Sequence, residues 1–212
     1  GTGTPNLSIF SVDRSYNGFM YRVNITGDCG VPARSVEVEL TVETAPEILT
    51  PPEGLTVCVN NPATFTVDAQ GSNMNYQWQV NTGASFVDID PADPLYSGAN
   101  TGTLTLLSAQ VAQSGYRYRV TITGSCAPAA TTSPVMLLVN TNPAIDDQPL
   151  DAAICEDGNT FFGASASGPD LVFQWMVNRQ DGFDFVPLSD DSIHVGASTD
   201  QIMLTDVPVS MN

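Results

Sequence analysis

Four cysteines are the side chains of this 212-residue chain whose type and spacing most directly imply chemistry. Cys29, Cys58, Cys126 and Cys155 form no Cys-x-x-Cys pair and do not cluster with the single histidine, so the spacing disfavours a zinc site. Disulfide bonds are the preferred interpretation, and free thiols or a reduced metal site are the alternatives. Disulfides would place the protein outside a reducing cytosol.

Cys58 and Cys126 are the two cysteines that fall within one sequence repeat, residues 45–140, and we predict that they pair. Cys29 and Cys155 are predicted to pair with cysteines outside this chain. The Cys58–Cys126 bond would close a loop of 68 residues and, in the chain-entropy description, stabilise the repeat by about 4 kcal/mol. We expect this bond to tie one end of a domain rather than to bridge its centre.

Acidic side chains offer a second possible chemistry, because Asp88, Asp90 and Asp93 lie in one short segment, "DIDPAD". Their oxygens could hold Ca²⁺, and paired acids could hydrolyse a glycoside. The segment lacks the twelve-residue spacing, with a glycine and a terminal glutamate, of an EF-hand loop. Solvated turn acids are therefore the preferred interpretation. No metal or cofactor is expected, with Ca²⁺ at these three residues as the alternative.

The single histidine, His194, has no neighbouring cysteine and belongs to no Ser-His-Asp pattern. Its counterpart in the repeat at 45–140 is Tyr96 or Ser97, so no candidate base recurs. We interpret His194 as an exposed turn residue. No catalytic residue is assigned, and the chain is not expected to be an enzyme.

Four aromatic residues could form a platform for sugar rings, but their regular spacing favours core packing instead. They are Phe86, Tyr96, Phe183 and Phe185.

Charge narrows the classes of partner. The chain has 23 acidic residues against six basic ones, and its formal net charge is -17. A field of this sign repels phosphate backbones and anionic lipids, so nucleic-acid and membrane-surface partners are not expected. No stretch approaches the roughly 20 apolar residues of a membrane-spanning helix.

A repeat with a period of 97 residues organises the chain. The segment "YRVNITGDC", which ends at Cys29, returns as "YRVTITGSC", which ends at Cys126, and Trp78 returns as Trp175. We predict the C-terminal part of a repeat in residues 1–44, a complete repeat in 45–140 and the N-terminal part of another in 141–212. The chain is expected to be a section of a longer array.

Alternation of apolar and polar residues predicts half-buried strands in each repeat. In the complete repeat the clearest run places Tyr116, Tyr118, Val120 and Ile122 on one face. Turn-forming residues separate such runs, and together they predict an all-β, two-sheet sandwich. The segments "ETAPEILTPPEG" and "NTNPAIDDQPLDA" are rich in proline and are expected to be extended, semi-rigid linkers between domains stacked end to end.

Two features of the complete repeat resemble the immunoglobulin fold: the tryptophan on the third strand and the "SGYRY" segment that leads into a late strand. The longer series "YQWQVNTGASFVDI", "YSGANTGTLTL" and "SGYRYRVTITGSC" resembles the immunoglobulin-like repeats of giant type IX-secreted cell-surface proteins of Bacteroidota, including gliding-motility adhesins. This resemblance implies tandem immunoglobulin-like sandwiches at the cell surface.

The same resemblance suggests one modification site. The triplet Asp191-Ser192-Ile193 is similar to the acidic-Ser/Thr-aliphatic motif that members of this phylum O-glycosylate, so Ser192 is a candidate glycosylation site.

Three functions follow as hypotheses. The first is a non-catalytic structural or adhesive stalk of a large extracellular, cell-surface protein, with filament formation as one form of it. The second is a spacer in a secreted hydrolase, and the third is a carbohydrate- or protein-binding module. The expected partners are neighbouring repeats of the same chain, and surface glycans or other surface proteins are the further candidates.

Overall fold

The computed structural model describes residues 3–179 and 184–207. The chain divides into two compact units, Gly1–Leu138 and Val139–Asn212. The division between the two units lies two residues before the domain boundary predicted after residue 140. Residues 3–44 belong to the same compact unit as the complete repeat, and the boundary predicted after residue 44 stays a prediction.

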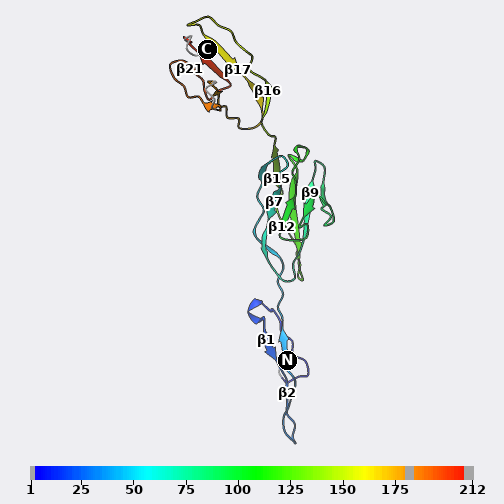
Figure 1. The fold of residues 1–212 in the computed structure, drawn as a ribbon. Helices are drawn as coiled ribbons and strands as arrows, with labels where there is room; N and C mark the ends of the chain where they lie inside the picture. The colour runs from blue at the N-terminus through cyan, green and yellow to red at the C-terminus, as the bar shows by residue number, and fades with distance from the viewer. Residues whose placement is uncertain (1–2, 180–183, 208–212) are drawn as a thin grey trace. The chain divides into compact units, whose positions relative to one another are not determined.

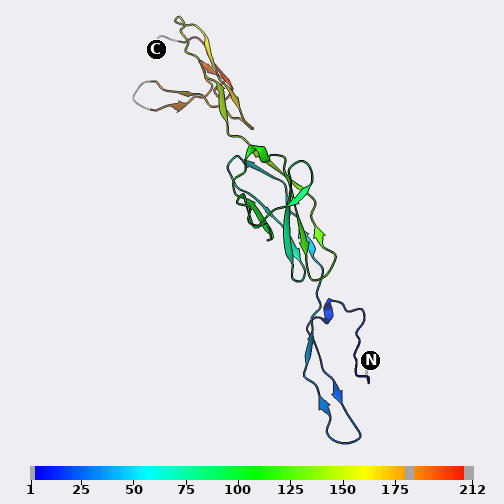
Figure 2. The ribbon, with the colours of Figure 1, turned by 90° about the vertical axis from the view of Figure 1, so that its right-hand side faces the viewer.

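The N-terminal part, residues 3–44, contains one long β-hairpin with two successive ladders, visible as a two-stranded ribbon in Figure 2. A short 3₁₀ helix precedes the strands, and β1 pairs with β4 while β2 pairs with β3, both antiparallel. The elements are η1 (Arg14–Tyr16), β1 (Phe19–Tyr21), β2 (Asn24–Ile25), β3 (Ala33–Arg34) and β4 (Val38–Leu40).

The complete repeat is a two-layer sandwich, in which β7, β9, β12 and β15 run lengthwise through the domain (Figure 1). One layer contains the order β11-β12-β7 with the pair β5-β8, and the other has the order β10-β9-β13-β15-β6 with β14 beside β13. The first layer comprises β5 (Glu47–Thr50), β7 (Ala63–Thr66), β8 (Asp68–Gln70), β11 (Tyr96–Ser97) and β12 (Thr103–Leu106). The second comprises β6 (Leu55–Cys58), β9 (Asn75–Asn81), β10 (Phe86–Asp88), β13 (Arg117–Thr123), β14 (Ala130–Thr131) and β15 (Val135–Asn140), and η2 (Val111–Gln113) precedes β13.

The C-terminal part repeats the first of these layers. Its sheet order β17-β22-β21 and its pair β16-β18 correspond to β7-β12-β11 and β5-β8. Its strands are β16 (Ala144–Asp147), β17 (Thr160–Gly163), β18 (Ser165–Ser167), β19 (Met176–Val177), β20 (Val186–Pro187), β21 (His194–Val195) and β22 (Gln201–Leu204).

The core of the complete repeat follows the predicted alternation. Trp78, Tyr118, Val120 and Ile122 are fully buried, while Arg117 and Thr123 on the opposite face of β13 are exposed. Each layer therefore presents one apolar face to the other, and burial of those faces is the main favourable term in the fold.

The two proline-rich segments predicted as linkers contain strands. β5 pairs with β8 through Ile48 opposite Ala69, and β16 pairs with β18 through Ile145 opposite Ala166. Each ladder has a register shift just after its isoleucine. The linker prediction was wrong here because the prolines flank β5 and β16 rather than lie within them, so the N–H groups between the prolines can join a ladder.

The complete repeat has a proximal end, where the chain enters, and a distal end. At the proximal end the Ser72 N–H donates to Thr44 O (3.1 Å) and the Ser125 N–H donates to Ser72 O (3.1 Å). At the distal end the Asn60 N–H donates to Ala109 O (2.7 Å). Strands β7 and β8 carry the chain from the distal to the proximal end over residues 63–70, a path of about 25 Å at the rise of a β-strand.

Phe65→Ala tests the packing between the layers. Phe65 is 1% exposed and its ring stacks on Tyr118 with centroids 4.7 Å apart, so the substitution is expected to lower the free energy of unfolding by about 3–5 kcal/mol. Urea unfolding followed by circular dichroism measures it. The control Thr66→Ala, on the exposed face of the same strand, should cost about 1 kcal/mol or less; equal losses for both variants would contradict the assigned faces.

Candidate functional site

A set of hydrogen bonds around one tryptophan recurs in both repeats and is the most conspicuous constellation in the chain. The Trp78 N–H donates to Ala99 O (2.9 Å), Trp78 O accepts from the Ile89 N–H (2.9 Å), and the indole Nε1–H donates to Thr101 O (2.9 Å). The equivalent bonds of Trp175 reach Ala197 O (2.8 Å), the Leu188 N–H (2.9 Å) and Thr199 O (2.9 Å). We call each set a tryptophan frame.

The loop that accepts these bonds has its own recurring geometry. Gly98 and Gly196 have φ angles of 78° and 94°, and a Cβ at either position would collide with the backbone oxygen of Thr103 or Gln201. The Thr101 hydroxyl donates to Gly98 O (3.1 Å) and closes the loop. In the sequence this loop is marked by a Gly-Ala-x-Thr motif that recurs at residues 98–101 and 196–199.

An aromatic cluster lies beneath the frame of the complete repeat. Tyr118 is buried against Phe65, and its hydroxyl lies 3.3 Å from that of Tyr96. Burial raises the pKa of the Tyr118 phenol far above its ordinary value and also raises the pKa of Tyr96, so both phenols stay protonated over the physiological range. These hydroxyls cross-link strands and are not poised as bases.

His194 occupies the position of Tyr96, since His194 lies opposite Leu204 as Tyr96 lies opposite Leu106. It is 4% exposed, so the prediction of an exposed turn histidine was wrong. Its Nδ1 lies 3.0 Å and 3.1 Å from the two carboxylate oxygens of Asp191. The Asp191 carboxylate also accepts from the backbone N–H groups of Ile193 (2.8 Å) and His194 (2.7 Å).

These bonds lower the pKa of Asp191 to about 2, chiefly because the two backbone N–H groups and then the imidazole stabilise the carboxylate. A histidine held by a carboxylate could serve a nucleophile, as in a hydrolase triad. Its Nδ1 faces the aspartate, and its side chain is buried, so the imidazole is not presented to a substrate. The pair therefore closes the turn before β21.

The three calcium candidates do not converge on a common point. Asp88 Oδ1 accepts from the Gln79 side chain across β9 and β10 (2.7 Å). Asp90 and Asp93 each accept from a backbone N–H two residues later, at 2.9 Å, and so stabilise their own turns. Among the described residues, no three His, Cys, Asp or Glu side chains gather closely enough to hold a metal ion.

The aromatic candidates also separate. Phe86 is half-buried on β10 beneath the Arg119 guanidinium, whose Cζ lies 4.0 Å from the ring centroid. Tyr96 is half-buried against Tyr118, and Phe185 is 57% exposed. Phe183 lies outside the described residues. Of these residues, Phe185 is the one that offers an open ring face.

The cysteine pairing predicted within the complete repeat does not form in the structure, where Cys58 and Cys126 are both free. Cys58 ends β6 at the distal end, and its carbonyl accepts from the Asn61 N–H (3.1 Å). Cys126 follows Ser125 at the proximal end. A disulfide requires Cα atoms within about 7 Å, whereas the strands between the two ends span about 25 Å. The structure therefore places Cys58 and Cys126 at opposite ends of the repeat and contains no bond between them.

Cys29 and Cys155 are likewise free and exposed in the structure, and their predicted partners outside the chain stay a prediction.

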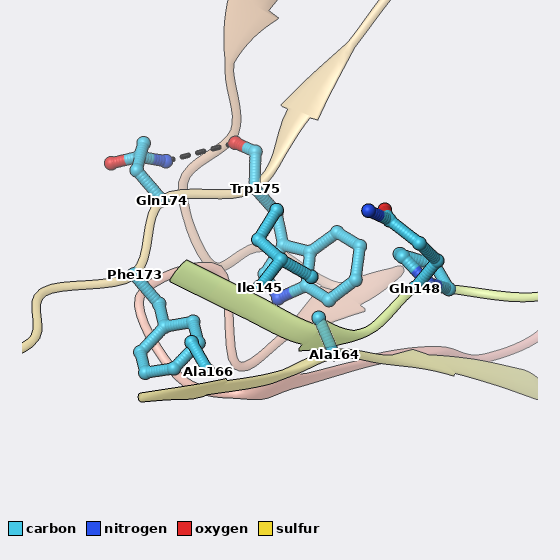
Figure 3. A pocket seen from close by; sticks show the side chains of 8 residues that line it. Ile145, Gln148, Ala164, Ala166, Phe173, Gln174 and Trp175 are labelled. Atoms are coloured by element: carbon cyan, nitrogen blue, oxygen red, sulfur yellow. Dashed lines mark hydrogen bonds between the residues drawn. The ribbon is translucent and has the colours of Figure 1, made fainter. Parts of the chain in front are cut away.

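The C-terminal part has an apolar groove of about 250 Å³ beside its tryptophan. Figure 3 shows the Trp175 indole beside Ile145 and Ala164, with Phe173 next to Ala166. The residues equivalent to Trp175 and Ala164 in the complete repeat, Trp78 and Val67, are buried in the core. The groove is thus a core-facing surface and not a pocket shaped for a ligand.

No helix in the described part of the chain has the length and apolar character needed to span a membrane.

Two curated proteins are similar to the chain in sequence, and no family model matches it. Endoglucanase C of Cellulomonas fimi is 28% identical over 138 residues, which are 64% of this chain and 12% of that protein. Human hemicentin-1 is 25% identical over 172 residues, 80% of this chain and 3% of that protein. The chain thus spans only a small part of the relatives that it matches.

Solved structures of tandem immunoglobulin domains resemble the chain. The titin fragment I67-I69 matches 79% of this chain and 57% of its own length with a TM-score of 0.60 and 17% identity. Sidekick-1 immunoglobulin domains 1-5 match 96% of this chain and 43% of their own length, with a TM-score of 0.55 and 18% identity. The all-β, immunoglobulin-like fold expected from the sequence is confirmed.

Asp191→Asn tests the histidine turn. Because the folded-state pKa of Asp191 lies below its ordinary value of 3.8, the carboxylate contributes stability that is complete above about pH 4 and is lost as the pH falls towards 2. An NMR titration should show the Ile193 and His194 amides shifting with a midpoint near pH 2, and the variant should abolish that step. A midpoint near 4, or a step that survives in the variant, would contradict the assignment; Ser192→Ala is the matched control.

Proposed function

We propose that this chain is a non-catalytic segment of a structural or adhesive stalk in a large extracellular surface protein of the type IX-secreted, gliding-motility adhesin kind. The observation that carries the proposal is what recurs between the repeats. The tryptophan frame returns with the same donors and acceptors, whereas groups capable of chemistry do not: His194 stands where Tyr96 stands, and Pro187 stands opposite Met176 where Asp88 stands opposite Gln79.

The segment between the N-terminal part and the complete repeat supports a stiff stalk. The Val42 N–H donates to Asn17 Oδ1 (2.8 Å) at the end of η1, and two residues later the Thr44 N–H donates to Ser72 Oγ (3.0 Å). Asn73 then bridges Glu43 Oε1 and Ser125 Oγ, both at 2.8 Å. We call this set the junction clamp. It leaves about 7 Å of extended chain between its two anchors, which restricts bending at this point.

Composition and similarity agree with an extracellular setting. Sidekick-1 immunoglobulin domains resemble the chain, and a further similar structure comprises extracellular domains of a Drosophila protein. The net charge of -17 favours solubility and disfavours nucleic acid. Neighbouring repeats of the same chain are the proposed partners, and surface glycans or other surface proteins are the candidates for adhesion.

A second function has one specific observation in its favour. The similarity to a stretch of endoglucanase C fits a spacer or carbohydrate-binding module of a secreted hydrolase. A binding module needs an exposed aromatic platform, and Phe185 alone is a narrow one. A pull-down with cellulose should give no binding by this chain if it is a stalk segment; specific binding lost in Phe185→Ala would favour the module.

Small-angle scattering tests the stalk. Segments of the native protein with increasing numbers of repeats should keep the cross-section of a single sandwich, while their maximum dimension grows linearly. The double variant Asn17→Ala, Ser72→Ala removes two anchors of the junction clamp and should broaden the distance distribution, whereas Ser97→Ala, on an exposed strand, should not. Compact particles, or a distribution unchanged by the double variant, would contradict a clamped rod.

Ser192 is the proposed O-glycosylation site. Its side chain is exposed in the turn that Asp191 closes, and its backbone oxygen accepts from the Thr205 hydroxyl (3.2 Å), so the turn is held in place while the side chain stays accessible. Mass spectrometry of the protein from its native host should find a glycan on the peptide that contains Ser192 and none after Ser192→Ala. An unmodified peptide from that host would refute the assignment.

A further inference from the structure

We propose that Cys126 forms a disulfide with the cysteine of the preceding repeat that corresponds to Cys58, so that each junction between repeats is covalently cross-linked. The inference rests on the proposed function, because it needs neighbouring repeats in the same chain. The proposed disulfide joins two neighbouring repeats, whereas the Cys58–Cys126 bond expected from the sequence would lie within one repeat.

The first step is the position of each thiol. Cys58 is exposed at the last residue of β6, at the distal end of its repeat, and Cys126 is partly exposed in the turn after β13, at the proximal end. Every repeat therefore offers one cysteine to the repeat before it and one to the repeat after it. About 25 Å of strand separates the two cysteines of one repeat, so they cannot pair with each other.

The second step is the distance across a junction. Cys126 is the neighbour of Ser125, which the junction clamp ties through Asn73 to Glu43. Glu43 is one period before Asn140, the last residue of β15, and β6 lies beside β15 in the sheet. A cysteine equivalent to Cys58 in the preceding repeat would thus end one strand away from the Val42–Glu43 segment, at a spacing of about 5 Å.

The third step is the turn chemistry around Cys126. Ser125 is bound to the rest of the proximal end through its own N–H and hydroxyl, which hold the turn and leave the Cys126 thiol partly exposed. The structure describes Cys126 as free, as expected of a thiol whose partner lies in another repeat.

Formation of the bond is a two-electron oxidation. The two thiols lose two protons and two electrons in total as the Sγ–Sγ bond forms, and a disulfide of a thiol oxidoreductase or a small-molecule disulfide outside the cytosol accepts them and becomes two thiols.

The cross-links would make the array hard to extend. Cys58 would pair with a cysteine 165 positions later in the chain. The segment of 29 positions from Cys126 to Cys155 would then connect the disulfide made by Cys126 to the disulfide made by Cys155. A pulling force is then carried by disulfides and short connecting segments rather than by the hydrogen bonds of each sandwich. This suits a stalk under load.

Disulfide mapping of the native full-length protein tests the proposal. Free thiols are alkylated without reduction, and the cross-linked peptides are identified by mass spectrometry. We expect Cys126 joined to the cysteine 165 positions before it, Cys58 joined to the cysteine 165 positions after it, and no two of the four cysteines of this chain joined to each other. A Cys58–Cys126 peptide, or alkylation of both thiols, would overturn the proposal.

A single substitution sharpens the result. Cys126→Ser in the same protein should expose one new alkylatable thiol, in the preceding repeat; if that thiol is Cys58, the proposal is wrong. The matched control Cys29→Ser should expose a thiol one repeat further upstream and leave the disulfide partner of Cys126 oxidised. Scattering of segments whose thiols are kept reduced, and the cellulose pull-down, test the stalk separately, because neither then depends on which cysteines pair.

Discussion

The indole hydrogen bond from Trp78 to Thr101 O is the interaction on which the complete repeat depends. It joins β9 of one layer to the loop before β12 of the other, in the centre of the core. The backbone of Trp78 adds two more bonds to the flanking loops, so one residue fixes the distance between layers and the course of two connections. A buried N–H without this acceptor would cost about 1–3 kcal/mol, which explains why Thr101 and the glycine that shapes its loop return with Trp175.

The acidic side chains that were candidates for metal binding or catalysis instead stabilise turns. Asp90, Asp93 and Asp191 each accept from a backbone N–H within their own loop. A carboxylate in such a turn has its oxygens directed at the chain, and little is left to bind a metal or polarise a substrate. The hydroxyls of Tyr96 and Tyr118 are likewise used within the fold, since they bond to each other across strands.

The cysteines show how strand length limits covalent chemistry. A disulfide spans a few ångströms, and a sandwich is several times longer, so cysteines at its two ends belong to different junctions. The junction clamp at Val42 and Thr44 brings the distal end of one repeat close to the proximal end of the next. Cysteines at these two ends are therefore near enough to each other to pair.

The amino-acid sequence by itself determined the all-β class, the period of 97 residues and the buried face of β13, because side-chain alternation and self-similarity are local properties of the chain. It also pointed to Trp78 and Trp175 as equivalent core residues. Tertiary structure alone decided the burial of His194, the pairing of the proline-rich segments as β5 and β16, and the separation of Cys58 from Cys126. These depend on which strands lie opposite one another, and pairing between residues distant in sequence leaves no signal in spacing alone.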